Sequence, residues 1–296
     1  MKSIDVKISS RLDHALRHDT GFSVRQAKTQ IKAGAVTVNG HLVKKPAFQV
    51  RPGDVLALDT QLRVEKGPAQ TESQFNLQIV FEDASVIAVN KPAGLLSVPT
   101  SHNQGRDISA LSKVQKFLER KGQKAWSVHR LDRFASGALV FAKSLDVRDT
   151  IMQQFKSKKV TKTYLALVDG DLSKFSKKAV IALPIDEQKG QKSVKIDAEK
   201  GKESKTEYEI LKTKGQLNLV KATAFSGRRH QVRIHFAKGL KPISGDALYG
   251  SGEKGLRQGS RVKLHCFELN FSHPNEKTPV TLQAPVFEDM SDGLFS

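Results

Sequence analysis

The chain has few of the features that mark secreted or membrane proteins. It contains one cysteine, Cys266, among 296 residues, which excludes an internal disulfide and fits a reducing compartment. No apolar run approaches the roughly 20 residues that a membrane-spanning helix needs. The opening residues, MKSIDVKISSRLD, lack the apolar core of a secretion signal. We therefore expect a cytoplasmic protein without membrane association, in which Cys266 is a small core residue.

Acidic residues are also scarce relative to basic ones. Asp and Glu total 30 against 49 Lys and Arg, which gives a formal net charge of +19. Such a surplus bears on binding partners more than on fold. It favours a polyanionic partner, and it favours nucleic acid over an anionic membrane surface. Hydrophobic residues make up 38% of the chain and charged residues 27%, so a sizeable core is expected. The length suggests one small and one larger domain.

The first part of the chain, from about residue 10 to 60, has the signals of a small helical and hairpin unit. RLDHALRHDTG predicts a helix that ends at its glycine. The next helix begins at Ser23, and Gln26 three residues later completes a capping-box pattern. Two short β-branched runs then flank Asn39-Gly40, a strong signal for a two-residue hairpin turn. VRPGDVLAL predicts a further turn and strand.

The second of these helices carries a basic stripe. Arg25, Lys28 and Lys32 are spaced along one face, about 100° around the helix from its apolar side. Taken alone, the stripe is either a solvated helix face or an RNA-binding surface. The ordered set of two helices, a VNG hairpin and a PGD turn resembles the alpha-L RNA-binding domain, first known from a ribosomal small-subunit protein. This resemblance implies that residues 1–66 bind RNA through the stripe.

The polar stretch that follows predicts a linker over residues 67–75, and the remaining residues 76–296 form a second block. In this block, Asp107 and Asp146 are each expected to be the N-cap of the helix that follows. Short strands and turns continue from there to the end. Because no regular strand–helix–strand repetition occurs, the sequence predicts an α+β domain with a mixed, mainly antiparallel sheet.

Several familiar motifs are absent or lack the structural context that their function requires. GSGEKG matches a dinucleotide-binding pattern, but it neither follows a buried strand nor opens a helix. HQVRIH is expected to be a strand, which places His230 and His235 on opposite faces and argues against a shared metal ion. The sequence has no C-x-x-C, H-E-x-x-H or G-x-S-x-G pattern. We expect no metal and no cofactor.

The segment HRLDRFASGALVFAKS places Asp132 between Arg130 and Arg133, directly before an apolar run. The arrangement suits either an ion pair at a strand end or a catalytic aspartate that meets a polyanion. The segment resembles the signature of the RluA-type pseudouridine synthases. FEDASVIAVNKPAGLLSVP, KTYLALVDG, SGRRHQVRIHFAKGLKPISGDALYG and LHCFELNFSHP agree with that family in the same order. The resemblance spans about residues 75–290 and implies an RNA pseudouridine synthase.

The chemistry of that reaction explains why such residues are wanted. Pseudouridine formation breaks the bond between a uracil nitrogen and ribose, turns the base, and rejoins it through carbon. A carboxylate can attack covalently, or it can remove a ribose proton to give a glycal, and the sequence does not choose between these routes. The resemblance implies that Asp132 is this catalyst, that Arg233 pairs with it, and that Tyr164 stacks on the base.

The same resemblance suggests roles for other residues of these segments. It implies that Arg130 contacts RNA near the target uridine, which must leave its stack to be reached. Arg133 is expected to be a phosphate contact or a surface charge. His129 is either a structural hydrogen-bonding residue or a functional one. Lys91 is interpreted as structural, with an RNA contact as the alternative.

Three positions depart from the family pattern. Ala135 and Arg229 stand where threonine is usual, and Cys266 where alanine is common, which bears on substrate fit more than on catalysis. We expect a monomer that acts on ribosomal RNA of the large subunit, with transfer RNA as an alternative substrate. A non-catalytic RNA-binding or ribosome-assembly protein and an RNA N-glycosidase are the competing functions.

Overall fold

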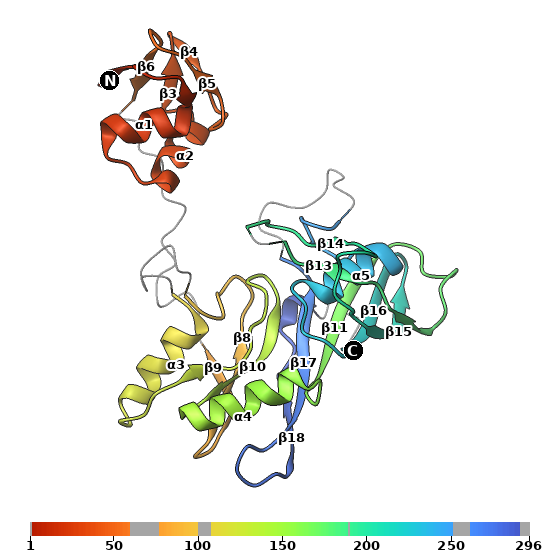
Figure 1. The fold of residues 1–296 in the computed structure, drawn as a ribbon. Coiled ribbons are helices and arrows are strands. Elements are labelled where there is room, and N and C mark those ends of the chain that lie inside the picture. The colour runs from red at the N-terminus through yellow and green to blue at the C-terminus, as the bar shows by residue number, and fades with distance from the viewer. Residues whose placement is uncertain (1, 60–76, 100–107, 189, 251–260, 291–296) are drawn as a thin grey trace. The chain divides into compact units, whose positions relative to one another are not determined.

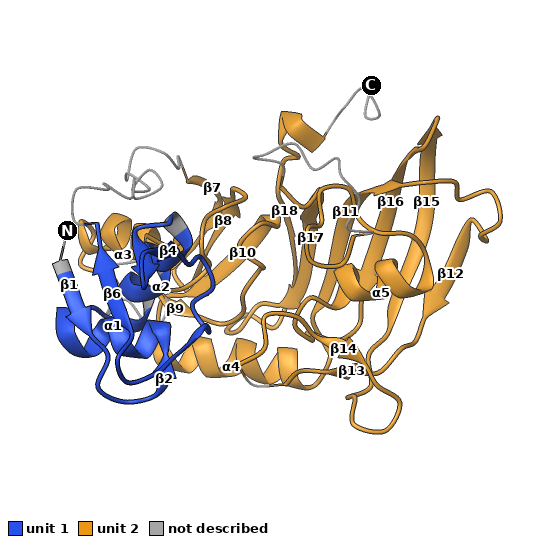
Figure 2. Ribbon diagram, turned by 90° about the horizontal axis from the view of Figure 1, so that it is seen from above, with its two compact units in different colours: residues 1–71 blue, residues 72–296 orange. Residues whose placement is uncertain are grey.

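The computed structural model describes residues 2–59, 77–99, 108–188, 190–250 and 261–290. The chain forms two compact units, residues 1–71 and 72–296 (Figure 2). The predicted linker over residues 67–75 lies outside the described residues. Most of the GSGEKG segment and Asp107 do so as well.

The smaller unit consists of two helices and short antiparallel strands, as predicted (Figure 1). Ser23 and Gln26 form the expected capping box, because each side chain accepts a hydrogen bond from the other residue's backbone N–H. Asn39 and Gly40 both have positive φ, as a tight hairpin turn requires. The elements are β1 (Lys2–Asp5), β2 (Ser10–Arg11), α1 (Leu12–Thr20), α2 (Val24–Ala33), β3 (Val36–Val38), β4 (His41–Leu42), β5 (Gln49–Val50) and β6 (Val55–Leu58).

The basic stripe on α2 is partly occupied by an internal contact. Lys28 Nζ lies 3.7 Å from Oδ2 of Asp13, a buried carboxylate that also accepts two hydrogen bonds from Arg11. Lys32 is exposed, whereas the side chain of Arg25 lies outside what the structure describes. Lys28 therefore helps to neutralise a buried charge within the unit.

The larger unit is built on one long sheet, which confirms the predicted mixed and mainly antiparallel arrangement. Within the described residues the strands follow the order β12-β15-β16-β11-β17-β10-β8-β7, and β18 and β9 pair with β17 and β10. The elements are β7 (Gln78–Glu82), β8 (Val86–Lys91), α3 (Ala110–Glu119), β9 (Trp126–Ser127), β10 (Ser136–Ala142), α4 (Leu145–Lys156), β11 (Thr161–Asp169), β12 (Lys178–Ile181), β13 (Ile185–Asp186), β14 (Lys195–Ile196), β15 (Thr206–Lys214), β16 (Leu217–Ala224), α5 (Gln231–Gly239), β17 (Leu264–Ser272), β18 (Pro279–Gln283) and a 3₁₀ turn (Glu288–Met290).

A short parallel pairing between β10 and β17 joins the two halves of this sheet. Gly137 of β10 pairs with Cys266 of β17, Cys266 pairs with Tyr164 of β11, and Tyr164 pairs with Ala222 of β16. This row crosses the middle of the sheet at one level. It sets the loop before β10, which carries Asp132, at the level of Tyr164.

Serine residues begin the helices where aspartates were expected. Ser144 is the N-cap of α4 and accepts a hydrogen bond from the N–H of Val147, so the prediction that Asp146 caps this helix is wrong. Ser109 caps α3 in the same way. Both serines have extended backbones and lie three residues before the N–H they bind, which is the geometry that an N-cap requires. Asp146 lies in the first turn instead, where its charge suits the helix dipole.

The HQVRIH segment is helical, so its expected strand conformation is wrong. Gln231–Gly239 forms α5, which packs against β15 and β16 (Figure 2). Each residue from Gln231 to Phe236 is buried. Val232, Ile234 and Phe236 alternate with Gln231, Arg233 and His235, a period of two that favours a strand. In the helix both sets are buried, so packing overrides the local pattern. His235 accordingly lies in the core, bonded to Ser204 and Thr206.

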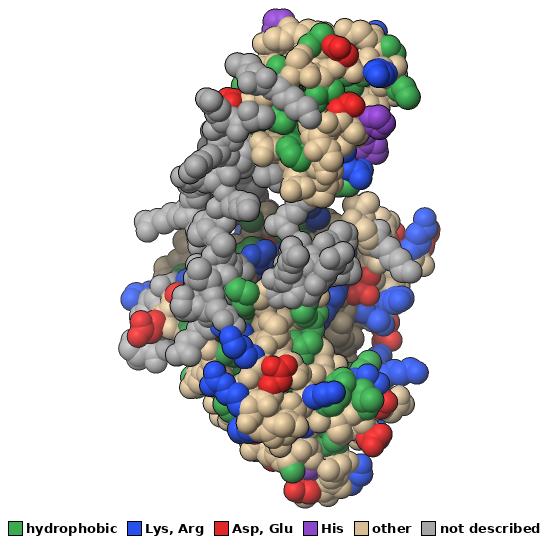
Figure 3. Space-filling model, turned by 90° about the vertical axis from the view of Figure 1, so that its left-hand side faces the viewer, with side chains coloured by type: hydrophobic (Ala, Val, Ile, Leu, Met, Phe, Trp, Pro, Cys, Tyr) green, Lys and Arg blue, Asp and Glu red, His purple; other side chains and the backbone are tan. Residues whose placement is uncertain are grey.

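The surface shows how the net charge is distributed. On the face that Figure 3 presents, Lys and Arg side chains are spread among Asp and Glu side chains rather than gathered into one continuous patch. Among the described residues, no helix has both the length and the apolar character to cross a membrane.

Replacing Gly137 tests the importance of the β10–β17 contact. Its φ is +115°, and a Cβ at this position would lie 2.2 Å from the carbonyl oxygen of Cys266. We expect Gly137→Ala to lower the free energy of unfolding by at least about 3 kcal/mol, from backbone strain together with overpacking. Gly215→Ala is the matched control, since it also has positive φ but no atom within 4 Å of the new Cβ, and it should cost about 1 kcal/mol. Urea unfolding measures both, and equal losses would contradict the steric argument.

Candidate active site

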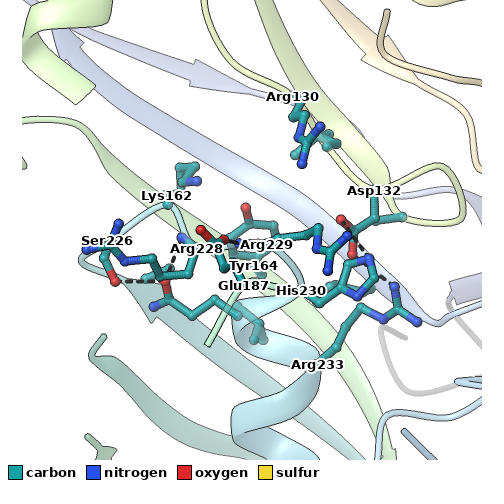
Figure 4. Close-up of a pocket in the computed structure, with 17 residues that line it drawn as sticks. Arg130, Asp132, Lys162, Tyr164, Glu187, Ser226, Arg228, Arg229, His230 and Arg233 are labelled. Carbon is teal, nitrogen blue, oxygen red and sulfur yellow. Dashed lines mark hydrogen bonds and ion pairs between the residues drawn. The ribbon is translucent and has the colours of Figure 1, made fainter. Parts of the chain in front are cut away.

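A pocket of about 260 Å³ opens between the loop before β10, strand β11, the end of β16 with the loop that leads into α5, the start of α5, the residue that follows β13, and the start of β17 (Figure 4). Most of its charged side chains are cations, and the acids are Asp132 and Glu187. The residues that line it are Arg130, Leu131, Asp132, Ala135, Lys162, Tyr164, Glu187, Ala224, Ser226, Gly227, Arg228, Arg229, His230, Gln231, Val232, Arg233 and Leu264.

Arg233 links two carboxylates at one end of this pocket. Its Nε donates to Oδ2 of Asp246 at 2.7 Å and its Nη2 to Oδ1 at 2.8 Å, a two-pronged pairing. Its remaining Nη1 donates to Oδ2 of Asp132 at 3.0 Å. The Arg233 side chain is 7% exposed and that of Asp246 0%, whereas that of Asp132 is 23% exposed. Asp132 is therefore the member of the group that a substrate can reach.

Burial and pairing act in opposite directions on these charges. Burial lowers the pKa of Arg233, but its hydrogen bonds to Asp246 and the charges of Asp246 and Asp132 outweigh this, so the pKa is raised. Burial raises the pKa of Asp246, and the hydrogen bond and charge of Arg233 reverse this, so its pKa is lowered. The backbone N–H groups of Leu248 and Tyr249 also bond Asp246 Oδ1. The pair stays ionised in the core because every charged atom has a partner.

His230 lies beside Asp132 from the start of α5, with Nε2 3.8 Å from Asp132 Oδ1. Its backbone is left-handed, with φ of 55°, and its Nδ1 is 2.8 Å from the Tyr249 hydroxyl. That hydroxyl accepts the N–H of Val194, which leaves its own proton to donate to His230 Nδ1. A neutral His230 then carries its proton on Nε2, toward Asp132. Burial lowers the pKa of His230, which favours this neutral form.

Lys91 holds the loop that carries Asp132 in place. This buried ammonium donates to the carbonyl oxygens of Pro92, Leu95, Arg133 and Ala135, at 2.6 to 3.2 Å. Burial lowers its pKa to about 7. The structural interpretation of Lys91 is therefore confirmed.

Tyr164 and Lys162 extend from β11 into the pocket. Tyr164 is 8% exposed, and burial raises its pKa well above its usual value, so the hydroxyl is neutral. Cys266 of β17, beside Tyr164, is fully buried as predicted, and burial raises the pKa of its thiol to about 12. The wall formed by Tyr164 and Cys266 is thus uncharged.

The remaining residues of the HRLD segment have different environments. His129 stacks on Phe155, accepts the N–H of Val140 through Nε2, and has its pKa lowered by burial to about 3, so its role here is structural. Arg130 and Arg133 are exposed, and Arg130 lines the pocket. Arg133 Nε donates to the carbonyl oxygen of Gly94. Arg130 is therefore available to a ligand at the mouth of the site, whereas Arg133 lies outside the pocket lining.

Arg229, one of the departures from the family pattern, holds the segment after β13 against the pocket. Its guanidinium donates to the carbonyl oxygens of Gln191 and Ser193, and its backbone N–H donates to Glu187. A threonine side chain is too short to make the two guanidinium contacts. Arg229 therefore shapes one wall of the pocket by a contact that the sequence did not suggest.

Metal ligands do not gather in the part of the chain that the structure describes. No group of three or more His, Cys, Asp or Glu side chains there has an arrangement that could hold a metal ion.

Comparison with known proteins now adds to this geometry. A family model described as RNA pseudouridylate synthase matches residues 85–238, more than half of the chain, and a model described as S4 domain matches residues 10–56. The chain belongs to the RNA pseudouridylate synthase family. The S4 match confirms that the small unit of this synthase is an RNA-binding domain of the alpha-L type.

Several relatives match this synthase over most of their length. Ribosomal large subunit pseudouridine synthase D of Xylella fastidiosa is 32% identical over 283 residues, 91% of this chain and 83% of the relative. Ribosomal large subunit pseudouridine synthase C of Pasteurella multocida is 32% identical over 276 residues, which cover 88% of this chain and 81% of the relative. Human RNA pseudouridylate synthase domain containing 4 superposes with a TM-score of 0.60 at 21% identity, covering 74% of this chain and 92% of that one, which shows the shared fold.

The structure brings together some of the expected residues and adds others. Asp132, Tyr164, Arg233 and Arg130 all line one pocket. Sequence reasoning missed Asp246, although it lies in the segment SGDALYG, where a carboxylate beside a glycine turn was the available signal. It also missed Lys162, which shares a strand face with Tyr164 because the two lie two positions apart in the strand. Glu187 and Tyr249 gave no sequence signal.

Removing the charge of Asp246 tests the clamp on Arg233. We expect Asp246→Asn to lower the free energy of unfolding at neutral pH by about 3 kcal/mol, the lower end for a broken buried pair, because Asp132 still faces Arg233. The pKa of Asp246 is lowered by folding, so its stabilisation is complete above its unfolded value near 4 and is lost as the pH falls further.

The stability curves of wild type and Asp246→Asn should therefore converge in acid. Urea unfolding between pH 7 and pH 2.5 measures this, with the exposed Asp146→Asn as control. A constant difference at every pH would show that Asp246 does not act through its charge.

Proposed function

We propose that this synthase isomerises specific uridines to pseudouridine in ribosomal RNA of the large subunit, with Asp132 as the catalyst. The observation that carries the proposal is the partly exposed carboxylate of Asp132 at the end of a cationic pocket, bonded to a buried arginine. Two of the relatives are named ribosomal large subunit pseudouridine synthases, which supports the choice of RNA. Transfer RNA is the alternative substrate.

Asp132 suits the reaction because its two oxygens differ. Oδ2 accepts the Arg233 hydrogen bond, while Oδ1 has only the longer approach of His230. Arg233 pairs with the carboxylate and fixes its orientation, which a nucleophile or base at this position requires. Attack on ribose and removal of a ribose proton both begin from this anion, so either route remains open to Asp132.

The rest of the pocket suits a base that has left its stack. Tyr164 offers an uncharged aromatic face beside Asp132, and we propose that the uracil stacks on it. Arg130, exposed at the mouth, would contact the RNA beside the vacated position. We propose that the synthase acts as a monomer in the cytoplasm, and no step of this reaction needs a metal or a cofactor.

Replacing Asp132 with asparagine tests the catalyst. Asparagine keeps the size but has no anionic oxygen, so we expect Asp132→Asn to lose at least about 10³-fold in rate, as when an essential catalytic group is removed, with unchanged RNA affinity. Ribosomal and transfer RNA from cells that lack this gene, labelled with tritium at carbon five of uridine, are the substrates. Tritium release measures the reaction, and Asp146→Asn is the matched control.

The same assay separates the competing functions. An N-glycosidase would release labelled free uracil, which chromatography detects, and a non-catalytic binding protein would release neither product. Comparison of the two RNA fractions shows which one carries the target. Appreciable turnover by Asp132→Asn would remove Asp132 as the catalyst.

The basic stripe of the S4 domain has a test of its own. Replacing Arg25 and Lys32 with glutamine leaves Lys28 in place to pair with Asp13. If both residues contact phosphates, the slope of log affinity against log salt should fall by about 0.7–0.9 for each. Filter binding to ribosomal RNA at several salt concentrations measures the slope. Lys7→Gln with Lys45→Gln, two exposed lysines outside α2, is the control, and an equal change there would show that the stripe is not special.

A further inference from the structure

Lys162 is a buried cation that the fold leaves without a hydrogen-bond acceptor. It is 9% exposed and lines the pocket from β11. Within the described part of the chain, no oxygen accepts a hydrogen bond from its Nζ, and its ring contact is Phe155, with 5.9 Å from Nζ to the centroid. Lys91 shows the contrast, since its buried ammonium is bonded to four carbonyl oxygens. Because Lys162 lines the pocket and no described oxygen accepts from its Nζ, a ligand in the pocket is the expected partner.

The groups around Lys162 do not neutralise it. Burial raises the pKa values of Tyr164 and Cys266, so both are uncharged at neutral pH, and burial keeps His129 neutral as well. Asp132 is the acid whose charge favours protonated Lys162, and it already bonds Arg233. Burial lowers the pKa of Lys162, which a bound anion would reverse.

The position of Lys162 in the pocket indicates which part of a nucleotide it meets. In Figure 4, Lys162 lies toward Ser226 and Arg228, Asp132 lies toward Arg233, and Tyr164 lies between them. Asp132 acts at the ribose, and the base stacks on Tyr164, so the base points its far edge at Lys162. The phosphates stay with the strand at the mouth, where Arg130 is exposed.

We propose that Lys162 is a further catalytic residue, which donates a hydrogen bond to a carbonyl oxygen of the target uracil and stabilises the negative charge that this base acquires. The inference rests on the proposed function. The bond between N1 and C1′ breaks with its electron pair on the base, so the charge is shared by N1 and the two carbonyl oxygens. Carbon five then bonds to C1′, its proton leaves, and N1 takes up a proton, so the atoms balance.

The magnitude of the effect follows from where this charge develops. A preorganised donor in a site that excludes water contributes most when charge appears in the transition state, and removing one such donor typically costs 10²–10³-fold in kcat. A phosphate contact would instead be made equally in the ground state, and its loss would weaken binding without slowing the bound complex.

Lys162→Met tests the proposal, because methionine fills the space without charge. The substrate is a synthetic stem-loop that carries the target uridine, labelled with tritium at carbon five, under single-turnover conditions with saturating enzyme. We expect the rate to fall by about 10²–10³-fold with unchanged Kd, and Lys162→Arg to restore part of it. The melting temperature should not fall, since an unpaired buried charge is removed. Lys159→Met, at an exposed lysine on the approach to β11, is the control.

A second substrate isolates the charge on the base. Carbon five of 5-fluorouridine carries fluorine and has no proton to lose, so the quantity compared is the single-turnover rate of N1–C1′ cleavage. Fluorine stabilises the uracil anion by itself, so this cleavage should lose distinctly less from Lys162→Met than cleavage in the uridine stem-loop does. Equal losses, a raised Kd with an unchanged saturated rate, or a fallen melting temperature would each overturn the proposal. A wild-type enzyme that releases no tritium would instead refute the proposed function.

Discussion

Arg233 is one buried positive charge that faces two carboxylates, and the site depends on how it divides its hydrogen bonds. Asp246 takes two of them and is completely buried, so the guanidinium plane has one orientation. The third reaches Asp132, which keeps one oxygen for the pocket. If Asp132 were the only partner, the arginine could turn with it. Asp246 therefore makes Arg233 a rigid support, and Asp132 obtains a fixed direction without losing both oxygens to it.

The sheet determines where this support can act. The parallel contact between Gly137 and Cys266 brings β10 alongside β17, and the same row continues to Tyr164. Lys91 then ties the loop before β10 to the turn after β8 through four carbonyl oxygens. A backbone contact too close for any side chain and a desolvated ammonium are both costly features. They position one loop, which indicates that the placement of Asp132 is what they stabilise.

Sequence reasoning succeeded where the signal is local or where several segments agree. The capping box at Ser23, the hairpin at Asn39-Gly40 and the antiparallel character of the sheet all follow from short-range patterns. It failed for α5, because polar and apolar residues alternate there with the period of a strand, while the helix buries both sets. The pairing of Arg233 with Asp132 was predicted from resemblance alone. Asp246, Glu187 and Lys162 were missed because their roles depend on contacts between segments that no local pattern encodes.

The net charge of +19 also conceals two kinds of cation that differ in physical role. Exposed residues such as Lys32 and Arg130 attract a polyanion, and salt screens them over a Debye length of about 10 Å. Arg233 and Lys162 are buried, so salt screens them much less, and Arg233 acts directly on the two carboxylates that it contacts. Recruitment of RNA should therefore weaken as salt rises, while the chemistry in an already bound complex should change little. Burial, which composition does not reveal, separates the exposed charges of this chain from those inside its pocket.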